Sequence, residues 1–146
     1  MRRPCPLFLF LFLFLLLSAS IAHGQIHTRL RVIQASNVGS VIDPALKDVH
    51  GKLGSLFSFT SYRLLRDQDV VLSPNQPARV QVHPEVFLEM TLMGLQSGNA
   101  EVKVRVNRSR TDILNTQIRL SPDRTVLVGG TRHGEGVVIY ALSAKF

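Results

Sequence analysis

A short basic segment contains the residues with the clearest potential for binding chemistry. Four of its side chains are cationic, and we call them the basic stripe: Lys103, Arg105, Arg108 and Arg110. Valines alternate with the first two cations, so a strand would place Lys103 and Arg105 on one face and the valines on the other. Such a stripe could contact sulfated polysaccharide, lipopolysaccharide phosphate or acidic lipid headgroups. The alternative is a solvated strand face whose charges prevent edge-to-edge aggregation.

A glycine-rich segment at residues 128–136 contains two further candidate contacts, Arg132 and His133. A phosphate-binding glycine loop opens a helix, whose N-terminus faces the anion. Here the glycines lead instead into the sequence Val-Val-Ile-Tyr at 137–140, which is typical of a strand. We therefore interpret 129–136 as a long hairpin loop whose glycines supply positive φ angles, with Arg132 and His133 available to an anion or a peptide.

Catalytic and metal-binding patterns are sparse in this sequence. The one cysteine, Cys5, lies near the amino terminus, the histidines have no partner at metal-ligand spacing, and no Gly-x-Ser-x-Gly motif is present. We predict no metal, no cofactor and no catalytic residue, and leave enzymatic activity open. A small exported enzyme or enzyme inhibitor would need a pocket that gathers Arg132, His133 and an acid such as Glu135 or Asp123.

The first residues predict a secretory signal peptide. Arg2 and Arg3 precede an unbroken run of Leu and Phe at 7–17, and small residues follow at 18–24. A helix formed by that run would be about 16 Å long, well short of the roughly 30 Å hydrocarbon core of a bilayer. Cys5 precedes the hydrophobic run, which argues against a lipoprotein. We predict a signal peptide at 1–24, export to the periplasm or the extracellular space, and no membrane span after cleavage.

The remaining residues, 25–146, predict a single domain. The whole chain has 17 Lys and Arg against 10 Asp and Glu, and of these only Arg2 and Arg3 lie in the signal segment. The predicted domain is therefore basic, and its apolar content suffices for a core. Nucleic acid is a disfavoured partner, because export separates the domain from it and aromatic residues for base stacking are few.

Apolar and polar residues alternate with period two along most of this domain, which is typical of strands. Turn sequences rich in Ser, Pro, Asn, Asp and Gly separate the predicted strands. Nine strands are predicted: 26–35, 57–65, 69–72, 78–83, 86–95, 100–106, 112–120, 125–128 and 137–144. The short spacings between them favour antiparallel pairing.

One segment breaks the alternation and predicts a helix from Pro44 to about Leu53. Asp43 is a suitable N-cap, Pro44 suits the first helical position, and apolar residues then recur at 46, 49, 53 and 56. The expected fold is therefore mainly β: an antiparallel β-sandwich or open barrel with one short helix near the N-terminus, which buries those apolar residues against one edge or end.

Five segments of the domain together resemble small exported bacterial β-domain proteins of unknown function: 43–48, 60–65, 114–116, 126–130 and 137–144. The resemblance implies an envelope location and a compact β domain, and it supplies no catalytic residue.

Three functions are compatible with these observations. The first is a non-catalytic exported β module that binds an envelope protein or an anionic glycan through the basic stripe, with Arg132 and His133 as further contacts. The second is the small enzyme or enzyme inhibitor described above. The third is a small outer-membrane β-barrel, because apolar residues occupy alternate positions up to Phe146. We prefer the first, with oligomeric state and partner left open.

Overall fold

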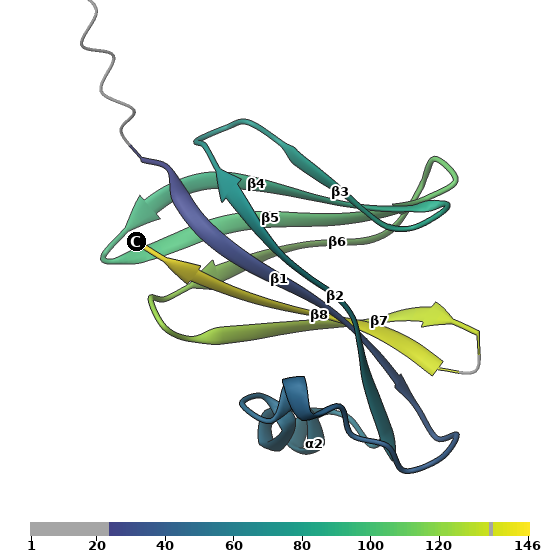
Figure 1. Cartoon of the computed structure of the whole chain (residues 1–146). Coiled ribbons are helices and arrows are strands. Elements are labelled where there is room, and N and C mark those ends of the chain that lie inside the picture. The colour runs from purple at the N-terminus through teal and green to yellow at the C-terminus, as the bar shows by residue number, and fades with distance from the viewer. Residues whose placement is uncertain (1–23, 135) are drawn as a thin grey trace, which may run out of the picture.

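The computed structural model describes residues 24–134 and 136–146. In this part of the chain one strand is followed by a short helical segment and then by seven further strands, arranged as in Figure 1. The strands are β1 (Ile26–Ser36), β2 (Ser61–Leu72), β3 (Ala78–His83), β4 (Val86–Gln96), β5 (Asn99–Arg108), β6 (Thr111–Leu120), β7 (Thr125–His133) and β8 (Gly136–Lys145). The helical segment consists of a 3-10 turn, η1 (Pro44–Leu46), and a helix, α2 (His50–Leu56). The predicted signal peptide lies outside the described residues except for Gly24.

The strands form two antiparallel sheets of four strands each. Sheet A has the order β2-β1-β8-β7, and sheet B has the order β3-β4-β5-β6. Sheet B is a meander of successive hairpins, whereas sheet A pairs the first strand of the chain with the last (Figure 1). The mainly β fold is confirmed, and of the two predicted architectures the sandwich is the one observed.

The main core lies between the two sheets, as the alternating pattern requires. Leu30 and Val32 of β1 and Val104 and Val106 of β5 are at most 1% exposed and belong to the same apolar cluster. Burial of such a side chain contributes about 1.5–3 kcal/mol. Because side chains in a strand alternate between faces, the residues between these positions lie on the outer face of each sheet.

A second, smaller core lies on the outer face of sheet A, where η1 and α2 cover it. Leu46 and Leu53 are fully buried there against Ile33 and Ile139 of the two central strands. The carboxylate of Asp43 accepts a hydrogen bond of 3.0 Å from the backbone N–H of Ala45, as expected for an N-cap. Sheet A therefore has an apolar core on each of its two faces, whereas the helical segment does not cover sheet B.

The bounds predicted for the helix are wrong. The segment divides into η1 and α2, and α2 begins at His50 and continues to Leu56. The division occurs around Asp48, whose side chain binds Arg31 of β1, so a tertiary contact overrides the helical pattern. Leu56, predicted to be buried, is 58% exposed in the last turn.

Two of the predicted strands, 57–65 and 69–72, are a single strand, β2, that begins at Ser61. Phe57 and Phe59 precede it and pack against the second core. The strand continues through its charged middle because Asp67 accepts two hydrogen bonds from Arg29 of β1, at 2.9 and 2.6 Å. The alternation is interrupted there by an irregularity in the β1–β2 register.

The predicted hairpin loop at 129–136 is also wrong in extent, because β7 continues to His133 and β8 begins at Gly136. Positive φ angles occur, as predicted, at Gly130 and Gly134, with φ of 109° and 57°. The other two glycines of the segment have a different role, which is packing.

Gly129 and Gly136 allow close approaches that a larger residue would block. A Cβ atom at Gly129 would lie 2.6 Å from the ring of Phe57, and one at Gly136 would lie 2.0 Å from the backbone oxygen of Ala35. Non-bonded carbon atoms pack at about 3.5–4.0 Å. These two glycines are therefore explained by packing and need no bound phosphate.

A polar pair within the core yields a stability prediction. The hydroxyl oxygens of Tyr140 and Thr131 are 3.1 Å apart, at residues 1% and 6% exposed, and burial raises the pKa of the Tyr140 phenol. Tyr140→Phe should lower the free energy of unfolding by about 1 kcal/mol, because it leaves the Thr131 hydroxyl without this partner. Urea denaturation measures the change, and the pair would be energetically irrelevant if the midpoint stayed at the wild-type value.

Candidate functional site

The basic stripe begins on the outer face of sheet B. Lys103 is exposed and Arg105 half-buried on this face, while Val104 between them is fully buried in the core. Arg108 ends β5, and Arg110 lies in the turn to β6. The alternation predicted for this segment is therefore present.

The turn after β5 holds Arg110 in an unusual backbone conformation. Ser109 and Arg110 have φ angles of 48° and 70°, which suits the two-residue hairpin turn with positive φ at both central positions. Ser109 also connects this turn to the β3–β4 turn, because its backbone N–H donates a hydrogen bond of 3.1 Å to the backbone carbonyl oxygen of Glu85. A non-glycine residue with positive φ is disfavoured by roughly 1–2 kcal/mol.

The four cations of the stripe differ in their partners. Arg105 binds the Glu89 carboxylate at 3.0 Å and lies 3.9 Å from Asp112. Arg108 donates to the backbone oxygen of Arg132 at 2.7 Å. Lys103 and Arg110 have no hydrogen bond or ion pair within the described part of the chain. Of the four, only Arg105 is ion-paired, so the stripe presents three positive charges without a carboxylate partner, and the hydrogen bond to a neutral carbonyl holds Arg108 in place.

A further cation without a carboxylate partner, Arg79 of β3, lies on the same sheet face, and the sequence interpretation missed it. The Arg79 guanidinium carbon is 4.7 Å from the centre of the Phe87 ring, a favourable cation–π distance. Arg79 is also the register partner of Glu89, which is in turn the register partner of Arg105. A prediction of the strand register in the hairpin formed by residues 78–95 would have placed Arg79 beside the basic stripe.

These residues surround a shallow surface hollow of about 280 Å³, which we call the arginine hollow. Its described lining residues are Arg79, Phe87, Glu89, Arg105, Asn107 and Arg110. The lining therefore includes three arginines and one glutamate, and it keeps a net positive formal charge even when Asp112, 3.9 Å from Arg105, is counted with it. The Asn107 amide donates to Asp112 at 2.9 Å, which holds one wall in place. The arrangement can bind an anion with charge-assisted hydrogen bonds.

The second predicted site lies at one end of the stripe. Arg132 of β7 is exposed, and its backbone oxygen accepts the hydrogen bond from Arg108, so the structure brings these two candidates together. His133 ends β7. Because Gly129 and Gly136 serve packing, the glycine content of this segment no longer argues for an anion site there.

The groups with shifted pKa values lie outside the arginine hollow. The hydrogen bond from Arg31 lowers the pKa of Asp48, and the hydrogen bond from Arg29 lowers that of Asp67. Tyr140, whose pKa is raised by burial, lies in the core. Within residues 24–134 and 136–146, no three His, Cys, Asp or Glu side chains are grouped as a metal site would require.

Among the described residues, no helix has the length and hydropathy needed to cross a membrane.

Comparisons with protein-family models, with curated proteins and with solved structures found no match. The resemblance to small exported bacterial β-domain proteins therefore stays a prediction, and the proposal of function depends on the site alone.

Proposed function

We propose that this protein is a non-catalytic exported module that binds an anionic glycan of the cell envelope in the arginine hollow of sheet B. The observation that carries the proposal is the placement of Arg79, Arg105 and Arg110 around one hollow that contains a single described carboxylate. Guanidinium groups form paired hydrogen bonds with carboxylate and sulfate groups. Export and the envelope location remain part of the proposal.

A glycan suits this face because polar side chains continue beyond the hollow. Lys103 pairs in register with Thr91 and Gln117, and Arg105 pairs with Asn115, all on outer-face positions of three adjacent strands. Amide and hydroxyl groups can donate hydrogen bonds to sugar hydroxyls and accept hydrogen bonds from them. A saccharide chain lying across β4, β5 and β6 would then combine ionic contacts at the hollow with neutral hydrogen bonds along the sheet.

The test compares two double variants that remove the same charge. Arg79→Ser with Arg110→Gly removes two unpaired cations at the hollow, whereas Lys47→Ser with Arg124→Ser removes two exposed cations elsewhere. With heparin as the anionic probe, the first variant should bind at least about a hundredfold more weakly, because it loses two charge-assisted contacts and each contributes about 1.5 kcal/mol or more. The control should bind within about twofold of the wild type, and uncharged dextran should bind to none of them.

Equal weakening in both double variants would overturn the proposal, because it would show attraction to net charge rather than to the hollow. Retained binding in the first variant would also overturn it. Circular dichroism and urea denaturation would establish that each variant is folded before binding is measured.

A single substitution separates binding from stability. Arg110→Gly relieves the positive φ angle of 70°, so it should raise the free energy of unfolding by up to about 1 kcal/mol while weakening heparin binding. Opposite changes in the two measurements identify Arg110 as a binding residue. A loss of both stability and binding would assign it a structural role in the turn instead.

A further inference from the structure

Sheet A extends beyond the end of sheet B, and this leaves part of its inner face uncovered. Figure 1 shows the C-terminal end of β1 and the beginning of β2 well away from the strands of sheet B, at the bottom of the view. Along β1 the inner-facing positions Leu30 and Val32 are buried in the core. The next two residues on this face of β1 are Gln34 and Ser36, and both are half-buried. Polar residues thus replace apolar ones where the opposing sheet ends.

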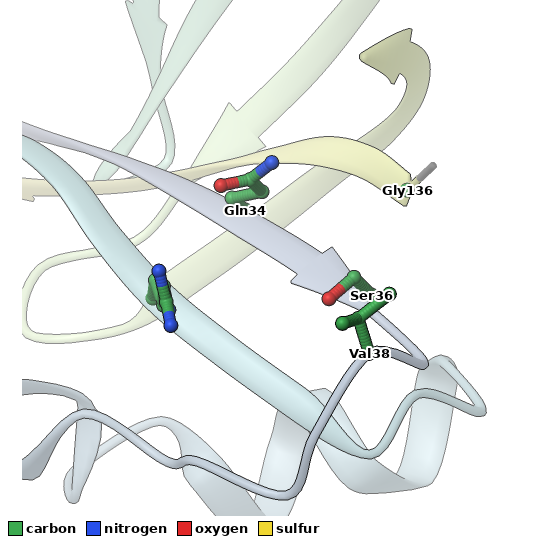
Figure 2. A pocket seen from close by; sticks show the side chains of 5 residues that line it. Gln34, Ser36, Val38 and Gly136 are labelled. Atoms are coloured by element: carbon green, nitrogen blue, oxygen red, sulfur yellow. The ribbon is translucent and has the colours of Figure 1, made fainter. Parts of the chain in front are cut away.

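These positions border a hollow of about 290 Å³, which we call the sheet-end hollow (Figure 2). Its described lining residues are Gln34, Ser36, Val38, Arg63 and Gly136. Gln34 and Arg63 are register partners on β1 and β2, so their side chains leave the sheet on the same face. Figure 2 shows Gln34 and Ser36 along one strand, with Gly136 at the beginning of β8.

The polar side chains of this hollow are unpaired within the described residues. Neither the Arg63 guanidinium, the Gln34 amide nor the Ser36 hydroxyl has a side-chain hydrogen bond there, and no described Asp or Glu lines the hollow. Two arginines on the outer face of the same sheet differ in this respect, because Arg29 and Arg31 each bind an aspartate, at 2.6 and 2.8 Å.

We propose that the sheet-end hollow binds the carboxylate group of a small monocarboxylate, independently of the arginine hollow. One guanidinium matches a single negative charge, and its two parallel N–H groups fit the two oxygens of a carboxylate. Gln34 and Ser36 supply further donors, and Val38, which is 62% exposed, offers an apolar wall to the rest of the ligand. A divalent phosphate or sulfate would keep half its charge uncompensated.

The test is an NMR titration of the full domain with sodium propionate, observing backbone amides and arginine Nε–H groups. Saturable shifts are expected at Arg63, Gln34, Ser36 and Gly136, with sodium sulfate and sodium chloride about tenfold weaker at the same groups. The Nε–H groups of Arg79 and Arg105 report on the arginine hollow in the same spectra, so failure of one site is distinguishable from failure of the other.

Arg63→Lys, which keeps the charge but loses the paired donors, should weaken propionate binding about tenfold. Arg124→Lys is the matched control at an exposed turn position and should leave it unchanged. Linear, unsaturable shifts, equal shifts with chloride, or wild-type affinity in Arg63→Lys would each overturn the proposal.

Discussion

Gly136→Ala should lower the free energy of unfolding by about 3 kcal/mol, the upper end of the range for overpacking. The added Cβ would lie 2.0 Å from the backbone oxygen of Ala35 and 3.0 Å from its carbonyl carbon. Ala35 belongs to β1, which is hydrogen-bonded to β2 on one side and β8 on the other. The obstacle is thus fixed backbone, unlike a side chain that could rotate away.

The matched control is Gly54→Ala in α2, where a Cβ atom would meet nothing within 4 Å. Alanine is favoured over glycine in a helix, so this change should stabilise the fold by about 0.5–1 kcal/mol. Urea denaturation followed by circular dichroism measures both variants. A Gly136→Ala protein within about 0.5 kcal/mol of the wild type would refute the close approach of β8 to β1.

Asp48→Ala should lower the free energy of unfolding by about 2 kcal/mol, because it removes the anion from a buried cation. The side chain of Arg31 is 3% exposed, and its Nη1 lies 2.8 Å from the Asp48 carboxylate. The Asp48 side chain is 58% exposed, so water replaces part of the lost interaction and keeps the effect below that of a fully buried pair. Adding Arg31→Met to Asp48→Ala should recover part of the loss.

This ion pair also has a defined pH dependence. The hydrogen bond from Arg31 holds the pKa of Asp48 below its ordinary value, so the folded state binds fewer protons than the unfolded state near that pH. The contribution of the ion pair to the free energy of unfolding is therefore complete above about pH 4, which is the pKa of an aspartate in the unfolded chain. It is lost as the pH falls through the lower pKa of Asp48 in the folded state. The difference in the free energy of unfolding between the wild type and Asp48→Ala should stay constant from about pH 8 to 5 and become smaller below about pH 4.

Asp67→Ala provides the control for this prediction. Arg29 and Asp67 form the same kind of pair on the same sheet, at 2.6 Å, but their side chains are 45% and 37% exposed. An exposed ion pair contributes about 0.2–1 kcal/mol to the free energy of unfolding. Asp67→Ala should therefore destabilise the fold clearly less than Asp48→Ala does. Equal losses at the two positions would show that the burial of Arg31 has no energetic consequence.

Much of the fold was predictable because the alternation of apolar and polar residues depends on local chain geometry. The strands predicted at 78–83 and 112–120 agree with β3 and β6 to within one residue. The prediction failed where tertiary contacts decided the structure. Asp48 binds Arg31 and Asp67 binds Arg29, and near these contacts the observed bounds of the helix and of the strand differ from the predicted ones. Such contacts join residues far apart in the sequence, and no local pattern encodes them.

The candidate site was predictable only along one strand. The spacing of Lys103 and Arg105 placed them on an outer face, as β5 shows. The sequence could not place Arg79 beside them, because that depends on the register of two hairpins. Nor could it show that Glu89 pairs with Arg105. Charge pairing across strands changes the number of free cations, and it requires the assembled sheet.

The pairing of β1 with β8 has a consequence for how the chain folds. It brings His27 opposite Lys145 and Ala35 opposite Val137, so the contacts of sheet A span nearly the whole described chain. Such high contact order slows folding, because loop-closure entropy is lost before the contacts are gained. Sheet B needs only local hairpins and can form earlier. Because β8 lies at the centre of sheet A, that sheet cannot be completed until the last strand has been synthesised.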